Sequence, residues 1–74
     1  MKSYRLSVIV EKDKNGYYAF APDFQGCYSQ GDSYEEALEN IKDAIRLHIE
    51  DLLDSGDSID VPESVSLTSL EIAV

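Results

Sequence analysis

The sequence predicts an α+β fold with the element order β-β-β-α-β, in which one helix covers one face of a small antiparallel sheet. Three observations predict this fold. Apolar and polar residues alternate near both ends of the chain, an Asn-Gly pair follows the first alternating segment, and an apolar stripe with helical spacing fills the middle. A chain of 74 residues has room for only one such domain, which we place at residues 1–74.

The first two predicted strands form a hairpin. Residues 4–10 alternate between apolar and polar side chains, which is typical of a half-buried strand. The turn is expected at Asn15 and Gly16, because this pair readily adopts the positive φ angles that a tight hairpin needs. Residues 17–21 then return antiparallel to the first strand.

The third predicted strand spans residues 27–30. The second strand ends at residues 22–23, Pro-Asp, because proline cannot donate a hydrogen bond to a neighbouring strand. Residues 24–26 form a short connection, and the Gly-Asp pair at residues 31–32 closes the third strand. Three consecutive strands connected in this way make a meander.

A helix is predicted to begin at Ser33. Ser33 and Glu36 have the spacing of a capping box, in which each residue satisfies a backbone N–H at the start of the helix. Gly56 is the expected stop. The apolar positions recur every three or four residues and form one stripe that can lie on a sheet: Tyr34, Ala37, Leu38, Ile41, Ala44, Ile45, His48, Ile49 and Leu52.

The last predicted strand spans residues 69–74. Residues 54–63 are rich in acids and turn formers and indicate a loop, and Pro62 prevents strand pairing there. Alternation returns at residues 69–74, where Leu70, Ile72 and Val74 share one face.

The size of the chain favours self-association, because a domain this small buries only about 60% of its unfolded surface. No stretch approaches the roughly 20 apolar residues that a membrane span requires. The apolar stretch at residues 6–10 is too short for a secretion signal, so we expect a cytoplasmic location. Cys27, the single cysteine, is expected to be buried on a strand.

Acidic residues dominate the middle of the chain. The net charge of the whole chain is −9, and residues 32–63 alone carry eleven acidic and two basic groups. Residues 1–16 carry a net charge of +2. Such a field repels phosphate backbones, so direct binding of nucleic acid is not expected, whereas encounter with a basic protein is favoured. The alternative is a solvated helix that keeps a small protein soluble.

Residues with catalytic potential are few, and we expect no cofactor and no metal. His48 lies in the apolar stripe, which favours a place in the core or in a homodimer contact over a catalytic role. Asp23 and Asp32 flank the third strand and could in principle bind Mg²⁺ with helix acids. Glu36 is already used by the cap, however, so a metal-dependent nuclease is the weaker alternative.

Aromatic residues are concentrated between the second and third strands. Tyr18 and Phe20 share one face of their strand and Tyr17 lies on the other, so one set points away from the helix. Without nearby basic groups, this set fits a contact with a partner protein or a second copy better than RNA stacking. Leu47 lies outside the apolar stripe and is a second candidate for an exposed contact.

Residues 16–52 carry four motifs in a fixed order: Tyr-x-Ala, Pro-Asp-hydrophobic-x-Gly-Cys, Gly-Asp-Ser and Glu-Ala-x-x-Asn. This half of the chain resembles the N-terminal domain of the HicB antitoxin family. The resemblance implies a partial RNase H-like fold that lacks the nuclease carboxylates, and no enzymatic activity. Members of the family neutralise HicA, a small basic toxin that cleaves mRNA, so the implied function is that of an antitoxin in a type II toxin–antitoxin system.

Many members of this family continue into a C-terminal DNA-binding domain, which we do not expect in this chain because it ends at Val74. Alternatives to the antitoxin function are a residual RNase H-like nuclease and an adaptor that binds another protein. We expect a homodimer or higher homo-oligomer. The predicted contacts with the toxin come from helix acids and from the loop before the third strand: Glu35, Glu39, Asp43, Glu50, Asp23 and Phe24.

Overall fold

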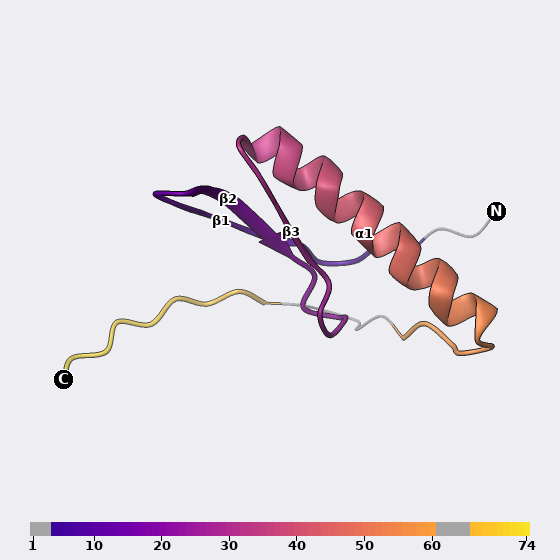
Figure 1. Ribbon diagram of the computed structural model, residues 1–74. Helices are drawn as coiled ribbons and strands as arrows, with labels where there is room; N and C mark the ends of the chain where they lie inside the picture. Colours follow the sequence, from indigo (N-terminus) through magenta and orange to yellow (C-terminus); the bar gives the residue numbers. More distant parts are fainter. Residues whose placement is uncertain (1–3, 61–65) are drawn as a thin grey trace.

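Three antiparallel strands followed by one helix form the computed structural model, which describes residues 4–60 and 66–74. The strands lie side by side in the order β1-β2-β3, and the helix packs on one face of this sheet (Figure 1). The predicted α+β class and the order β-β-β-α are therefore confirmed. The elements are β1 (Ile9–Asp13), β2 (Gly16–Phe20), β3 (Tyr28–Gly31) and α1 (Tyr34–Asp54).

The hairpin between β1 and β2 differs from the prediction in where β1 begins and in which residues form the turn. β1 begins at Ile9 rather than at residue 4, and the turn consists of Lys14 and Asn15 instead of Asn15 and Gly16. The Asp13 side chain explains the shift, because its Oδ1 accepts a hydrogen bond of 2.8 Å from the Asn15 N–H and so starts the turn one residue earlier. Gly16 opens β2 with a φ of +127°, which glycine tolerates.

Helix α1 begins and ends as predicted. The Ser33 Oγ accepts a hydrogen bond of 3.1 Å from the Glu36 N–H. The Glu36 carboxylate reaches back one residue further than in a standard capping box and accepts from the Asp32 N–H at 3.3 Å. At the other end, Gly56 has a φ of +80° and its N–H donates to the Leu53 carbonyl, which closes the helix in a Schellman-type cap.

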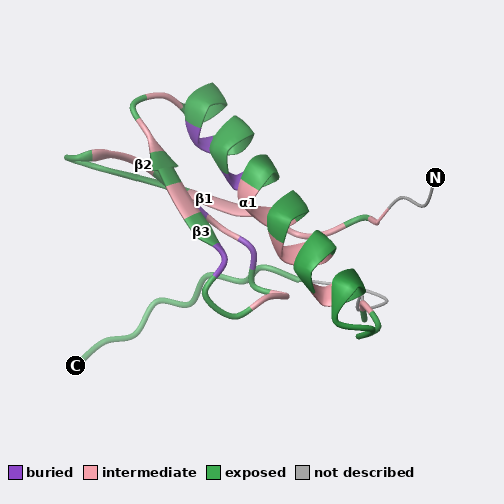
Figure 2. Ribbon diagram, turned by 45° about the vertical axis from the view of Figure 1, so that its right-hand side comes forward, coloured by how far each residue is buried: buried purple, intermediate pink, exposed green. Residues whose placement is uncertain are grey.

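The core lies between α1 and the inner face of the sheet. Its large, fully buried side chain is Ile41, and the predicted burial of Cys27 is confirmed. The remaining buried positions are alanines, so the layers approach closely; Figure 2 shows the buried parts of α1 and of the sheet turned toward each other. The buried set is Ala19, Ala21, Cys27, Ala37 and Ile41.

Gly31 marks the closest approach between β3 and α1. A Cβ at this position would lie 2.6 Å from the Ala37 backbone nitrogen, too close for any side chain without a shift of the helix. On the same flank, the Asn40 side chain donates a hydrogen bond of 2.8 Å to the carbonyl of Gln30 in β3. The helix therefore fits tightly along β3.

The predicted fourth strand is not formed. Residues 69–74 are described by the structure, but they have no strand partner and their side chains are exposed. Figure 1 shows this end of the chain as an extended trace that runs away from the helix. Alternation gives a segment a preference for strand structure, but a strand forms only where its backbone groups find a partner. Pro62, which we expected to interrupt pairing, lies outside the described residues.

Candidate partner-binding surface

The four helix acids predicted to contact a partner share one face of α1. At about 100° per residue, Glu35, Glu39, Asp43 and Glu50 fall within about 80° of one another around the helix axis. All four are exposed. Their sector lies opposite the one that carries the buried Ala37 and Ile41, so the helix separates a packed face from an acidic face.

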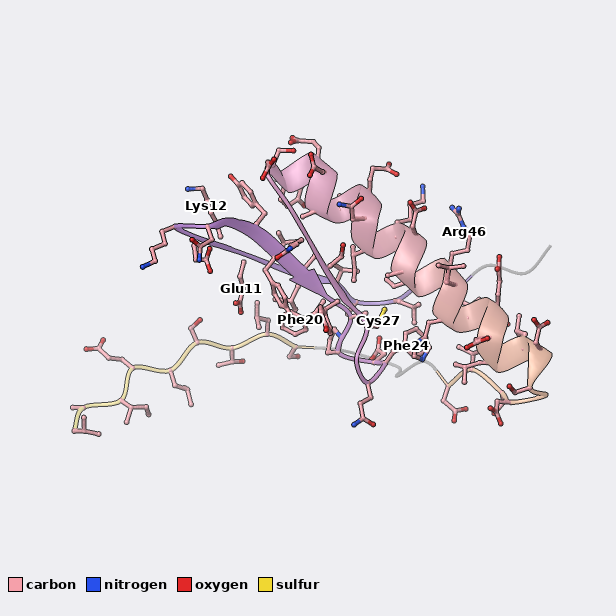
Figure 3. The ribbon with its side chains drawn as sticks, viewed as in Figure 1. Glu11, Lys12, Phe20, Phe24, Cys27 and Arg46 are labelled. Carbon is pink, nitrogen blue, oxygen red and sulfur yellow. The ribbon has the colours of Figure 1, made fainter. Side chains whose placement is uncertain are left out.

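One basic residue lies within this acidic face. Arg46 forms an ion pair with Asp43, with 3.6 Å between its Nη1 and the Asp43 Oδ1. Figure 3 shows Arg46 on the side of α1 that faces away from the sheet. Because both side chains are well exposed to solvent, the pair adds little stability, and either residue can exchange its partner for a charge on another molecule.

Asp23 and Phe24 lie apart from the helix acids. The Asp23 carboxylate accepts a hydrogen bond of 3.4 Å from the Ser7 N–H, and the residue is half-buried. The Phe24 ring stacks on the His48 ring with 4.6 Å between centroids, on the packed side of α1. His48 is thus half-buried against an aromatic ring of the same chain. The structure brings the four helix acids together but places this loop on the other side of the helix.

The outer face of the sheet, away from the helix, carries three aromatic rings. Tyr18 lies 5.9 Å from both Phe20 and Tyr28, measured between ring centroids, and its ring is stacked on that of Tyr28. Tyr18 and Tyr28 are exposed, and Phe20 is half-buried. The prediction that Tyr18 and Phe20 share a face is confirmed, since Tyr17 packs against the core instead. We call Tyr18, Phe20 and Tyr28 the aromatic patch.

Within residues 4–60 and 66–74, no three His, Cys, Asp or Glu residues are grouped so that they could hold a metal ion. Asp32 directly follows β3, whereas Asp23 lies in the loop before it, so the strand separates these two carboxylates. Burial raises the pKa of the Cys27 thiol, which keeps it protonated and weakly nucleophilic. These positions give no support to a metal-dependent nuclease.

Among the described residues, no helix has the length and apolar character needed to cross a membrane. Helix α1 is long enough, with 21 residues, but its mixed composition includes a full acidic face.

A comparison with models of protein families identifies the family to which this domain belongs. The model of a HicB_like antitoxin of bacterial toxin-antitoxin systems matches residues 6–72, which is nearly the whole chain. The chain belongs to this HicB-like antitoxin family. The family that the motifs of residues 16–52 indicated is therefore confirmed.

Relatives in this family come from distant microbes. A UPF0150 protein of Helicobacter pylori is 60% identical over 47 residues, covering 64% of this chain and 65% of its own length. One from Synechocystis is 51% identical over 51 residues, covering 68% of this chain and 65% of its own length. One from Thermotoga maritima is 34% identical and covers 97% of both chains. The match thus spans just under two thirds of the first two relatives. No solved structure matches the chain.

Two features of this family member were not predicted from the sequence. The first is the separation of Asp23 and Phe24 from the helix acids, which results from contacts with Ser7 and His48 that have no periodic signal. The second is the unpaired outer edge of β1 among the described residues. It was not predicted because we expected a fourth strand in the sheet. The relation to RNase H stays a prediction.

Proposed function

We propose that this chain is an antitoxin that binds and neutralises a small, basic, HicA-like toxin that cleaves mRNA. The observation that carries the proposal is the acidic face of α1 in a member of the HicB-like antitoxin family. Four exposed carboxylates on one rigid helix suit a positively charged ribonuclease, because complementary charge speeds encounter and fixes orientation. The antitoxin would act in the cytoplasm, where mRNA is translated.

The proposed contact has a charged part and an apolar part. Glu35, Glu39, Asp43 and Glu50 attract the toxin through the helix face, and the loop residues Asp23 and Phe24 add a second contact. Since the loop lies on the other side of α1, a toxin that touches both must reach around one end of the helix or contact two copies of the chain. A homodimer or higher oligomer meets the second condition.

Direct binding of nucleic acid is not part of the proposed mechanism. The net charge of −9 repels a phosphate backbone, and residues 15–31, which include the aromatic patch, contain no Lys or Arg. The chain instead removes toxin activity by covering the basic surface with which the toxin binds mRNA.

The experiment first asks whether the reading frame next to that of this chain encodes a small basic protein, and then uses that protein. The purified basic protein is incubated with mRNA while the full 74-residue chain is titrated in. We expect mRNA cleavage to fall to background near one equivalent of the chain, and the two proteins to co-purify. Cleavage that persists in excess chain would contradict the proposal. So would Mg²⁺-dependent cleavage of RNA by the chain alone, which is the outcome expected of a nuclease.

A further inference from the structure

The sheet is open at β1. β1 lies at one edge of the order β1-β2-β3, so within residues 4–60 and 66–74 no strand pairs with its outer side. The opposite edge differs, because α1 lies closely along β3 and Asn40 donates a hydrogen bond to the Gln30 carbonyl. An unpaired edge strand presents a row of backbone N–H and C=O groups that can accept another strand.

An apolar groove lies beside this open edge. It has a volume of about 390 Å³ and separates the segment that leads into β1 from helix α1. Leu6 and Val8 line one wall, and Leu38, Ile41 and Ile45 line the other. The helix touches β1 less than β2 or β3, so part of its apolar stripe is uncovered on this flank. Leu38 is accordingly exposed, although its position belongs to the stripe.

Residues 69–74 have the composition of a strand but no strand partner in the part of the chain that the structure describes. Leu70, Ile72 and Val74 share one face and are exposed, Leu70 to 78% and Ile72 to 73%. Such a row of large apolar side chains gains free energy by leaving water, and its spacing of two residues suits the face of a sheet. The described part of the chain therefore contains both an edge strand with an unpaired side, β1, and an unpaired segment with the pattern of a strand, residues 69–74.

We propose that residues 69–74 of a second copy pair with the open edge of β1, and that the two copies exchange these segments reciprocally. Leu70, Ile72 and Val74 of each copy then cover the groove of the other. The exchange completes both sheets at once, as expected for a two-fold interface. It also enlarges a core in which Ile41 is the large, fully buried side chain.

Charge places little restriction on this occupant. The exchanged segment carries a single charged side chain, Glu71, and is otherwise apolar or uncharged. The edge strand β1 carries Glu11, Lys12 and Asp13, so the apolar side chains, and not charge, favour the exchange.

Of the acidic face of α1, Glu39 lines the groove, whereas Glu35, Asp43 and Glu50 do not. Most of that face therefore stays available, and the exchange does not depend on the proposed toxin.

The first test asks which chain supplies the strand. Full-length protein labelled with ¹⁵N and deuterium is mixed with ¹³C-labelled protein, unfolded and refolded together, and examined by isotope-filtered NMR. We expect contacts between the amide protons of Ile9–Asp13 in one labelled chain and the side chains of residues 69–74 in the other. A dimeric sample that shows no such contacts between the two labelled chains would overturn the proposal.

The second test measures the oligomeric state by light scattering. Ile72→Pro removes an N–H and an apolar side chain from the exchanged segment, and should raise the dimer dissociation constant by more than about tenfold. Ser66→Pro is the matched control, since it lies before the segment at an exposed position. Circular dichroism checks that α1 is retained in both. A monomeric wild type, or an Ile72→Pro variant that dimerises as tightly as wild type, would contradict the exchange.

Discussion

The two flanks of helix α1 are built differently. On the β3 flank, Gly31 lets the helix approach within a distance that excludes a Cβ, and Asn40 binds the strand backbone directly. On the β1 flank, a groove of about 390 Å³ separates the helix from the segment before β1, and Leu38 is exposed. We call the β3 side the closed flank, because β3 and α1 follow each other in sequence and pack directly together. We call the β1 side the open flank, because the proposed exchange would supply a strand there from a second copy.

This difference teaches that the closed flank holds the domain together and the open flank is available for assembly. Substitutions of residues buried between α1 and the sheet should therefore unfold the chain, whereas substitutions on exposed positions should leave the fold intact. The following predictions test that contrast, beginning with the largest effect.

Ile41→Asp should abolish folding. Ile41 is 1% exposed between the helix and the sheet, so the substitution buries an unpaired carboxylate. Such burial costs several kcal/mol, about as much as the whole stability of a small domain. Thermal unfolding followed by circular dichroism is the measurement. Leu47→Asp is the control on the same helix, because Leu47 is 67% exposed. A cooperative melt of Ile41→Asp at the wild-type temperature would show that the packed face is misplaced.

Gly31→Ala should destabilise the closed flank by about 1–3 kcal/mol, the usual cost of overpacking. The added Cβ would meet the Ala37 nitrogen at 2.6 Å, and backbone atoms on both sides must move. Urea denaturation gives the free energy of unfolding. Gly56→Ala separates sterics from backbone strain, because nothing lies within 4 Å there and only the φ of +80° opposes alanine. If Gly31→Ala were as stable as wild type, the close approach of β3 and α1 would be disproved.

Cys27 should react slowly with iodoacetamide in the folded chain. Burial raises the pKa of its thiol above the ordinary value of 9.0, so little thiolate forms at neutral pH. The unfolded chain loses this proton first as the pH rises, so the Cys27 contribution to stability is complete below pH 9.0 and declines above it. Mass spectrometry of alkylation in buffer and in urea checks the prediction. Equal rates in both would place Cys27 at the surface.

Local interactions account for the parts of the fold that could be predicted. Ser33 and Glu36 begin the helix and Gly56 ends it through contacts within four residues, and such contacts are readable from sequence. The hairpin turn moved by one residue because the Asp13 side chain competes with the Asn-Gly preference. The fourth strand failed as a prediction because alternation at residues 69–74 carries no information about which edge, or which chain, supplies the partner.

The candidate partner-binding surface also has a part that could be predicted from the sequence and a part that could not. The four helix acids follow from helical periodicity alone, so their shared face could be predicted once the helix was placed. Where the loop around Phe24 lies depends on its stacking with His48, 24 residues away in sequence. No pattern in the sequence encodes that contact, so the position of the loop relative to the helix acids could not be predicted.

The central claim is that the acidic face of α1 captures a basic toxin. Its most direct test is the stopped-flow association rate of the chain with that toxin at low and high salt. Glu39→Lys/Asp43→Lys/Glu50→Lys is compared with Asp54→Lys/Asp57→Lys/Asp60→Lys, which makes the same change in net charge outside the proposed contact.

We predict that reversal on the helix face slows association at low salt by at least about tenfold more than the control reversal does, and that the difference shrinks at high salt, where charges are screened. Equal rates for the two variants at low salt would contradict the account, because net charge alone, and not the face of α1, would then govern capture.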